Sequence, residues 1–310
     1  LSLLLSPAFG FTAVIIVLYL FKYLFKNKEI FKDPSQNNNK PPPMWIRLIL
    51  VTTCTLVSFF HGNNDGQKGV GILMIVLLAM LPSYYAINPQ LKVDKMKTAI
   101  TDMKEATSDY MHGASDDPYH ESLGMLDDIE KDVIALENGD KAHRVDTRKH
   151  IQSFGKISKT LLADPAFLTE SQDRKKFKHG LDNLKTATDF APVEAILLIS
   201  LSLGFGTMVG WKRIVVTIGE KIGKTHLTYA QGAAAELVAA GTIGLSSGFG
   251  LPVSTTHVLS SGIAGSMVGM GGLKNLQKNT ISTIAIAWLL TLPITFAASL
   301  AFYYLFNWLL

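Results

Sequence analysis

Apolar residues gather in long runs along this chain, and the length of the runs predicts helices that cross a membrane. Residues 1–21 are apolar apart from Ser2, Ser6 and Thr12. Further apolar runs cover residues 48–87, 190–211, 229–249, 253–270 and 281–310. About 20 such residues span the hydrocarbon core of a bilayer. We therefore expect an all-α polytopic membrane protein, with a transmembrane helix over 1–21 and a transmembrane domain over 189–310.

The run over 48–87 is roughly twice the length of a normal span at about 1.5 Å per residue. Glycines and polar residues interrupt it at residues 61–69. This pattern predicts a broken helix or a re-entrant pair over 48–87.

Residues 88–188 follow a different pattern, in which apolar positions recur at helical spacing between charged ones. Met96, Ile100 and Met103 are one example, and Leu126 and Ile129 begin another. Such spacing is typical of amphipathic helices with one face in water. We therefore expect residues 88–188 to form a small helical extramembrane insert.

The distribution of charge supports this division. Charged residues make up only 17% of the chain, against about 25% in soluble domains. Residues 88–188 hold 16 of the 29 basic and 18 of the 25 acidic residues. This composition excludes an ordinary soluble protein, and the one cysteine, Cys54, excludes a disulfide within the chain.

Two short basic segments predict the orientation. Residues 22–47 carry six basic and two acidic side chains, and Lys212, Arg213, Lys221 and Lys224 follow the run over 190–211. Short loops rich in Lys and Arg face the cytoplasm. We expect 22–47 to be a basic cytoplasmic linker and, if 48–87 crosses once, the insert to lie on the other side of the membrane.

Few ionisable residues lie inside the apolar runs. They are His61, Asp65, Lys68, Glu194, Glu236 and His257. A charge at the bilayer centre costs about 2.5–3.5 kcal/mol or more, so each such group needs a partner or a water-filled cavity. Lys68 and Glu194 have an alternative, because side chains near helix ends can reach the interface. Asp65 and Glu236 are the stronger functional candidates.

Residues 250–257, Gly-Leu-Pro-Val-Ser-Thr-Thr-His, predict a helix start at membrane depth. Gly and Pro end the preceding helix, and Ser254 or Thr255 is a suitable N-cap. Unpaired N–H groups, the positive end of the helix dipole and three hydroxyls suit a tetrahedral oxyanion. We therefore expect Ser254, Thr255 and Thr256 to bind such an anion, with a capped helix start that binds no ligand as the alternative.

The interruption at 61–69 has complementary chemistry. Asn63, Asn64 and Asp65 present the oxygen ligands that hard cations prefer. His61 and Asp65 are four residues apart and would share a face if the helix were continuous. One interruption therefore suits a cation and the other an anion, which predicts a co-transport site.

Two further patterns favour structural interpretations. Gly206 and Gly210, Gly244 and Gly248, and Gly265 and Gly269 each have the spacing that allows close helix packing in lipid. The cluster His112, Asp116, Asp117, His120 and Glu121 could ligate a divalent metal, but its spacing matches no defined site and favours a solvated loop. No resident metal is expected.

The two interruptions also carry a family resemblance. The stretch His61-Gly-Asn-Asn-Asp-Gly-Gln-Lys-Gly69 resembles the Asn-Asp signature of the PiT family of inorganic phosphate transporters. Residues 250–257 are similar to the second signature of that family, and residues 206–232 to the stretch that precedes it in the bacterial low-affinity branch. The Gly-Gln-Lys after Asp65 departs from other branches, which leaves the coupling ion open.

The resemblance implies a secondary transporter that moves inorganic phosphate with protons, with sodium or as a neutral metal phosphate. The PiT family is built from two inverted repeats, and this chain contains one copy of each signature. We therefore expect half of an inverted-repeat transporter, with the other repeat before Leu1. The partners expected are phosphate, the lipid bilayer, the missing N-terminal repeat and further copies of the chain; no nucleic acid and no cofactor other than the coupling ion are expected.

The resemblance also implies residue roles. Asp65, Ser254, Thr255 and Thr256 would bind phosphate; Asn64, Asp65 and Glu236 would bind or couple the cation; and His61, Gln67 and His257 would line the path. The chain would lie in the cell membrane, in bacteria the inner membrane.

Two other functions stay open at this point. His61 and Asp65 have the His-x-x-x-Asp spacing by which a membrane acyltransferase deprotonates an acceptor hydroxyl. A channel, or a porter for another anion such as sulfate, would also explain the helix start at 250–257. Saturable ion-coupled uptake distinguishes a porter from a channel, and competition by sulfate distinguishes the anions.

Overall fold

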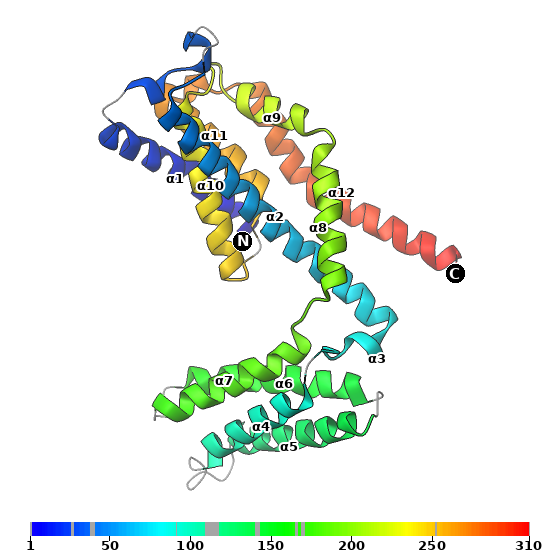
Figure 1. Cartoon of the computed structure of the whole chain (residues 1–310). Helices are drawn as coiled ribbons and strands as arrows, with labels where there is room; N and C mark the ends of the chain where they lie inside the picture. Colours follow the sequence, from blue (N-terminus) through cyan, green and yellow to red (C-terminus); the bar gives the residue numbers. More distant parts are fainter. Residues whose placement is uncertain are drawn as a thin grey trace. The chain divides into compact units, whose positions relative to one another are not determined.

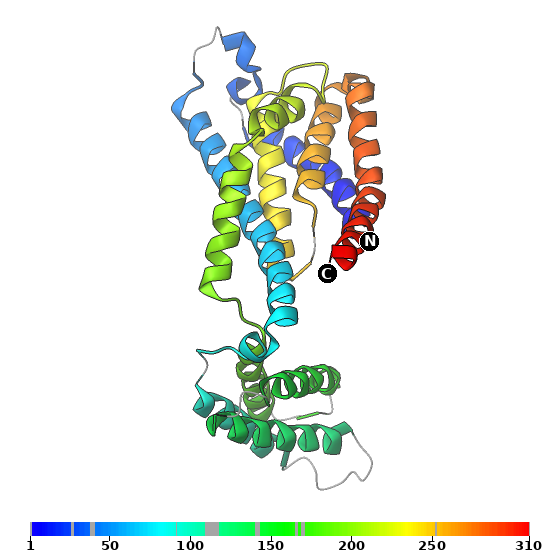
Figure 2. The same ribbon diagram turned by 90° about the vertical axis from the view of Figure 1, so that its right-hand side faces the viewer.

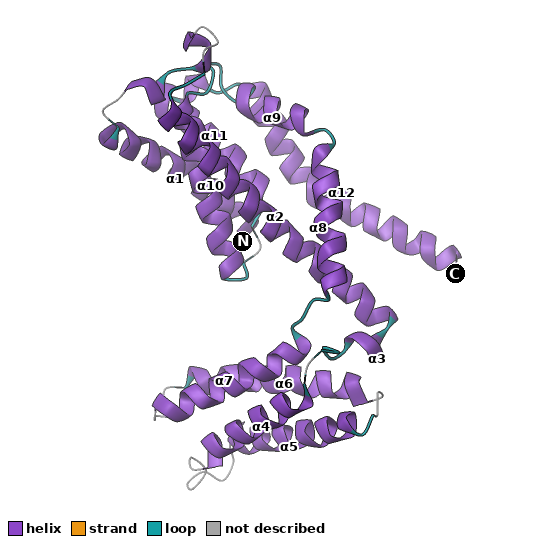
Figure 3. Ribbon diagram, in the orientation of Figure 1, coloured by secondary structure: helices purple, strands orange, loops and turns teal. Residues whose placement is uncertain are grey.

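A computed structural model of the chain describes residues 2–25, 28–37, 41–90, 92–108, 118–139, 143–164, 167–168, 171–251 and 253–309. Within these ranges the secondary structure is helical, and no strand is present (Figure 3). The α-helices are α1 (Ser2–Leu24), α2 (Met44–Met80), α3 (Pro82–Tyr85), α4 (Val93–Ser108), α5 (Pro118–Glu137), α6 (His143–Ala163), α7 (Ser171–Thr188), α8 (Val193–Met208), α9 (Trp211–Glu220), α10 (Tyr229–Gly248), α11 (Thr255–Gly271) and α12 (Lys278–Leu309). Short 3₁₀ helices cover Lys28–Phe31, Pro34–Asn37 and Leu273–Asn275.

By length and composition, three of the described helices can cross a membrane. Their spans are Leu5–Leu24 in α1, Met44–Met80 in α2 and Lys278–Trp308 in α12. Helices α8 and α9 add a fourth span if they count as one, although they are bent by 63°. The bend lies at Gly210, whose φ of 80° favours glycine. The sequence predicted a loop over the basic residues after Trp211, but Lys212 and Arg213 belong to α9.

The chain divides into two compact units. Residues 1–67 and 200–310 form unit 1, and residues 68–199 form unit 2. In unit 1, α1, α10 and α11 pack together, as Figure 1 and the perpendicular view in Figure 2 show. A Cβ atom added to Gly265 of α11 would lie 2.3 Å from the carbonyl oxygen of Phe11 in α1. The α1 and α11 backbones therefore approach as closely as glycine permits.

The break predicted over residues 61–69 is wrong. Helix α2 is continuous from Met44 to Met80. Glycine costs only about 1 kcal/mol relative to alanine inside a helix, and this segment contains no proline to remove an N–H group. An unsatisfied backbone group in lipid costs several kcal/mol, so an intact helix is the more stable solution.

The second predicted break is confirmed. Helix α10 ends at Gly248, and α11 begins at Thr255. Gly250 has a φ of 66°, and the N–H groups of Gly250 and Leu251 donate to the carbonyls of Ser247 and Ser246. This is the Schellman pattern that satisfies the last carbonyls of a helix. Gly250 therefore ends α10.

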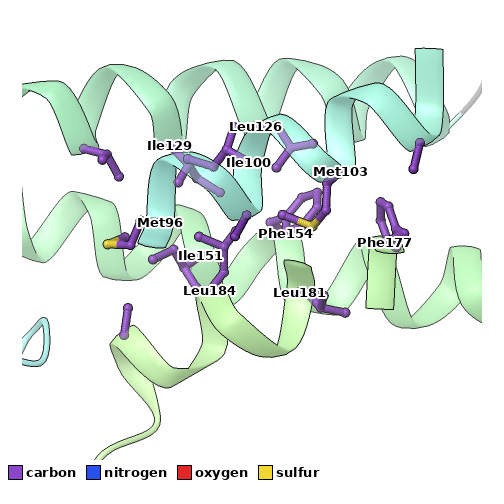
Figure 4. Packing of buried hydrophobic residues seen from close by; sticks show 14 of the residues in the cluster. Met96, Ile100, Met103, Leu126, Ile129, Ile151, Phe154, Phe177, Leu181 and Leu184 are labelled. Carbon is purple, nitrogen blue, oxygen red and sulfur yellow. The ribbon is translucent and has the colours of Figure 1, made fainter. Parts of the chain in front are cut away.

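In unit 2, helices α4 to α7 form a bundle around a core of large apolar side chains. Figure 4 shows Phe154 and Phe177 beside Met103, and their exposed fractions are all 0%. The pattern that predicted helices over 88–188 is realised in Met96, Ile100 and Leu126, which are buried. Whether this bundle lies outside the membrane remains a prediction.

The two ends of the bundle segment are tied together. The N–H group of Asn88 donates to the carbonyl of Ala187 over 2.8 Å. Arg148 of α6 donates to the carbonyls of Ala86 and Thr188 over 3.0 and 2.9 Å. Burial lowers the pKa of Arg148, although a guanidinium stays charged at any working pH. The chain therefore enters and leaves the bundle at one place.

Candidate functional site

Helices α2 and α10 run parallel along one face of unit 1, with polar contacts at both ends of an apolar patch. Thr53 of α2 contacts Glu236 of α10, and eleven residues later in both helices Asn64 contacts Ser247. Between these pairs, Phe60 lies against Gly244, where an added Cβ would be 2.8 Å from the ring. This arrangement fixes the register of the two helices.

Asn64, the first residue of the Asn-Asp motif, is only 3% exposed. Its Nδ2 donates to the hydroxyl of Ser247 over 3.0 Å. Its Oδ1 is buried and has no hydrogen-bond partner among the described residues. A buried amide oxygen without a donor is costly, and it is a suitable ligand for a cation or for a donor on a bound substrate.

Asp65 lies on the adjacent stripe of α2 and pairs with His61. The distance from Oδ2 of Asp65 to Nε2 of His61 is 2.9 Å. The two side chains are 33% and 44% exposed. Because α2 is continuous, the i and i+4 positions do share a face, as the sequence indicated.

Glu236 has a partner that the sequence analysis did not identify. The hydroxyl of Thr53 donates to Oε2 of Glu236 over 2.6 Å, and Thr53 is buried. Thr53 and Asn64 are eleven residues, about three turns, apart, so a helical projection of α2 would have placed them on one face without identifying the helix that this face contacts. That projection required α2 to be treated as one helix.

The Ser-Thr-Thr segment forms the helix start that the sequence predicted, with unequal roles for its hydroxyls. The hydroxyl of Ser254 accepts a hydrogen bond from the N–H group of His257 over 3.4 Å and so caps α11. Thr255 is buried and Thr256 is exposed. The sequence predicted this cap at Ser254 or Thr255, and Ser254 provides it, whereas anion binding by the three hydroxyls remains a prediction.

The remaining candidates have different surroundings. His257 is buried, and its ring lies against that of Trp288 in α12, with 4.2 Å between centroids. Gln67 is exposed. Their expected place along a transport path remains a prediction.

The two motifs meet through the apolar core of unit 1. Val253 and Val258, on either side of the hydroxyl segment, share a cluster with Val57 and Phe60 of α2. Ser247, which binds Asn64, also accepts a bond from Gly250 in the turn that ends α10. Tertiary packing therefore brings the Asn-Asp motif to the break that precedes Ser254, although 183 residues separate Asn64 from Ser247.

The described residues contain no group of three or more side chains that could hold a metal ion. His112, Asp116 and Asp117 of the acidic cluster lie outside the described residues.

Several apolar helices long enough to span a membrane, in a chain whose described residues form no strand, define an all-α polytopic membrane protein. The chain belongs to the phosphate transporter family, whose model matches residues 1–299. It is similar to the low-affinity inorganic phosphate transporter of Buchnera aphidicola from Acyrthosiphon pisum, with 33% identity over 98% of this chain and 67% of the relative.

Escherichia coli K12 supplies two further relatives, both low-affinity inorganic phosphate transporters. PitB is 34% identical over 94% of this chain and 65% of its own length. PitA is 32% identical over 98% of this chain and 68% of its own length. The chain thus spans about two thirds of the length of these relatives. No solved structure matches the chain.

Because the family and these named relatives are transporters, the acyltransferase alternative for His61 and Asp65 is set aside. The chain belongs to a family of transporters and not to a family of enzymes.

Proposed function

We propose that this chain forms part of a secondary transporter that moves inorganic phosphate across a cell membrane, in bacteria the inner membrane. Transport would be symport with protons or sodium, or transport of a neutral metal phosphate. The observation that carries the proposal is the contact between Asn64 and Ser247, which joins the cation-suited motif to the break before the anion-suited hydroxyls. The names of the relatives support phosphate as the cargo.

In this proposal, phosphate binds at the start of α11. Phosphate carries one to two negative charges at neutral pH, and burying it requires donors that replace its water. Thr255, Thr256 and the first N–H groups of α11 would supply them, together with Ser254, while Asp65 would bind phosphate through a protonated oxygen or through the cation. We also propose that an inverted N-terminal repeat and further copies of the chain are partners of this segment.

The cation would bind at Asn64 and Asp65, with Glu236 as the coupling residue. Oδ1 of Asn64, which has no hydrogen-bond partner among the described residues, and the carboxylate of Asp65, whose side chain is 33% exposed, are oxygen ligands on adjacent residues. They suit sodium or a divalent ion carried with phosphate. Glu236, held by Thr53, would take up a proton or balance the charge of the cargo.

Uptake of labelled phosphate by the full-length protein in vesicles tests this function. Asp65→Asn should abolish coupled uptake, because it removes a charged ligand of the proposed cation site. Membrane yield should stay normal, because the change removes a charge that lipid disfavours. Ser58→Ala is the control, since Ser58 is an exposed residue of the same helix and lies outside the motif. Wild-type uptake by Asp65→Asn, or equal competition by sulfate and phosphate in the wild type, would contradict the proposal.

The pair Thr53 and Glu236 offers a test of coupling. Glu236→Gln keeps the shape of the side chain but removes its titration, so the pH or cation dependence of uptake should change. Thr53→Val removes the hydroxyl that donates to Glu236 and should shift the same pH or cation dependence of uptake. Thr53→Ser keeps a hydroxyl and should give the wild-type dependence. Thr55→Val is the control, because the hydroxyl of Thr55 donates to the carbonyl of Val51 in its own helix. An unchanged profile in both Glu236→Gln and Thr53→Val would make the pair structural.

A further inference from the structure

A polar cavity lies at the other end of α10 from the break. Its volume is about 460 Å³, and its walls come from the 28–37 segment, residues 224–231 and residues 270–275. Its polar lining includes Asp33, Lys224, Thr225, His226, Lys274 and Asn275. Helix α10 has 20 residues, so about 27 Å separate this cavity from the contact between Asn64 and Ser247. The cavity is therefore distinct from the proposed transport site.

The two loops that carry the lysines are fixed to each other. The N–H group of Lys224 donates to the carbonyl of Asn275 over 2.7 Å. Oδ1 of Asn275, which is buried, accepts from the hydroxyl of Thr225 over 3.2 Å. Gly223 and Leu276 form an antiparallel bridge beside these bonds. Lys224 and Lys274 therefore start from backbone positions that are held side by side.

The charges of the cavity favour an anion. Lys224 and Lys274 are exposed, and neither forms a salt bridge within the described part of the chain. His226 lies on the same wall. The capping box occupies the N–H groups of Thr228 and Gln231, and the N–H group of Tyr229 donates to the carbonyl of Lys32 over 3.4 Å, so the lysines are the principal charged donors.

One wall of the cavity carries a carboxylate. Oδ1 of Asp33 accepts the N–H group of Ser35 over 2.8 Å, which fixes the side chain. A carboxylate repels an anion that has no proton to offer, but it accepts a hydrogen bond from one that has. Sulfate and phosphodiesters have no hydroxyl on the acid group at neutral pH, whereas inorganic phosphate and phosphate monoesters retain one for part or all of the time.

We propose that this cavity binds a phosphate group that carries a hydroxyl, with Lys224 and Lys274 on its charged oxygens and Asp33 on its hydroxyl. Inorganic phosphate and the headgroup of a phosphatidic acid share this chemistry. The volume exceeds that of one phosphate ion, so it accommodates a monoester as well. The site does not depend on the proposed transport function, because its occupation can be measured in a protein that transports nothing.

Protection of the lysines from an amine-acylating reagent, read by mass spectrometry on the full-length protein, tests the proposal. In phosphatidylcholine nanodiscs, inorganic phosphate at ten times its dissociation constant should slow labelling of Lys224 and Lys274 about tenfold. Lys278 is the matched control, since it is exposed and close in sequence but does not line the cavity. Its labelling should not change.

Two comparisons decide the chemistry. Sulfate at equal ionic strength should protect neither lysine in the wild type, but should protect both in Asp33→Asn. Nanodiscs that contain phosphatidic acid distinguish a lipid source from free phosphate, since protection without added phosphate would assign the same site to the lipid. Equal protection by sulfate and phosphate in the wild type, equal protection of Lys278, or no protection by either source would overturn the proposal.

Discussion

Helices α1 and α11 of unit 1 meet through small residues, whereas helices α4 to α7 of unit 2 meet through large ones. An added Cβ at Gly10 would lie 2.6 Å from the carbonyl oxygen of Val258, and one at Gly262 would lie 2.9 Å from Val14. Gly265 is closer still. In unit 2 the largest fully buried side chains are those of Phe154, Phe167 and Phe177. Gly180, which packs closely against Met103, is the exception among these large contacts.

This difference is the one expected if unit 1 folds in lipid and the bundle of unit 2 folds in water, which are the locations that the sequence predicts. In water, burying apolar area contributes about 25 cal/mol per Å², so large side chains are the efficient choice for a core. In lipid, that gain is absent because the surroundings are as apolar as the side chains, and helices associate through close backbone packing and hydrogen bonds. Unit 1 accordingly exposes large apolar residues such as Leu48, Phe296 and Phe302.

The largest expected effect comes from making a large residue small in unit 2. Phe154→Ala should destabilise the α4 to α7 bundle by about 3–5 kcal/mol, because it leaves a cavity in a close-packed core. Hydrogen exchange of the bundle amides in the full-length protein measures the loss. Ile134→Ala is the control, since Ile134 is 45% exposed, and an equal loss in both variants would contradict the assignment of the core.

The next effect comes from the opposite change in unit 1. Gly265→Ala should destabilise the packing of α1 on α11 by about 1–3 kcal/mol, because its Cβ would meet backbone and not a movable side chain. Unfolding in detergent measures this change. Gly241→Ala in α10 is the control, since an added Cβ there has nothing within 4 Å. Full stability of Gly265→Ala would show that the helices do not approach this closely.

A smaller effect is expected at the surface of unit 2, where Lys104 lies 2.5 Å from both Asp127 and Glu130. Burial lowers the pKa of Lys104, but the bonds to the two carboxylates more than offset this and raise it. The stabilisation is therefore fully present below the unfolded pKa and is lost as pH rises through the higher folded value. Lys104→Met should cost about 0.2–1 kcal/mol between pH 6 and 9, with the difference from wild type disappearing at more alkaline pH.

Hydrogen exchange of α4 and α5 as a function of pH measures this difference. Lys131→Met, at an exposed pair with Asp128 in α5, is the matched control and should cost less. A difference at Lys104 that grew with alkaline pH would have the wrong sign for the proposed origin.

The smallest effect on transport should follow removal of the bundle itself. Residues 92–184 can be replaced by a short flexible linker, because the bond from Asn88 to Ala187 holds the two ends together. Phosphate uptake by the full-length protein should then be unchanged, since none of the proposed site residues lies in the bundle. Loss of uptake at normal membrane yield would show that the bundle gates or assembles the transporter.

The sequence determined the features that depend on local chemistry. A run of apolar residues specified α1, and Gly250 with the N-cap Ser254 specified the break between α10 and α11. Helical spacing identified Met96, Ile100 and Met103 as core residues of the bundle. Each of these outcomes follows from residues within a few turns of one another, where propensity and periodicity act directly.

Glycine spacing was informative in part. Gly265 and Gly269 pack against α1, and Gly244 packs against Phe60, as expected. Gly206 and Gly248 have open space around them, and Gly210 forms a bend. The break expected at 61–69 did not form, since glycine weakens a helix without removing its hydrogen bonds.

Only the tertiary structure decided which polar groups meet. Thr53 lies beside Glu236, Asn64 beside Ser247 and His257 beside Trp288 because α2, α11 and α12 each have a neighbour that is distant in sequence. A helix turned about its axis by one residue presents a face about 100° away, so register between helices selects the partners. That register is set by how Gly244 and Phe60 fit together between the two polar pairs, a fit that depends on the packing of whole helices and that no local stretch of sequence specifies.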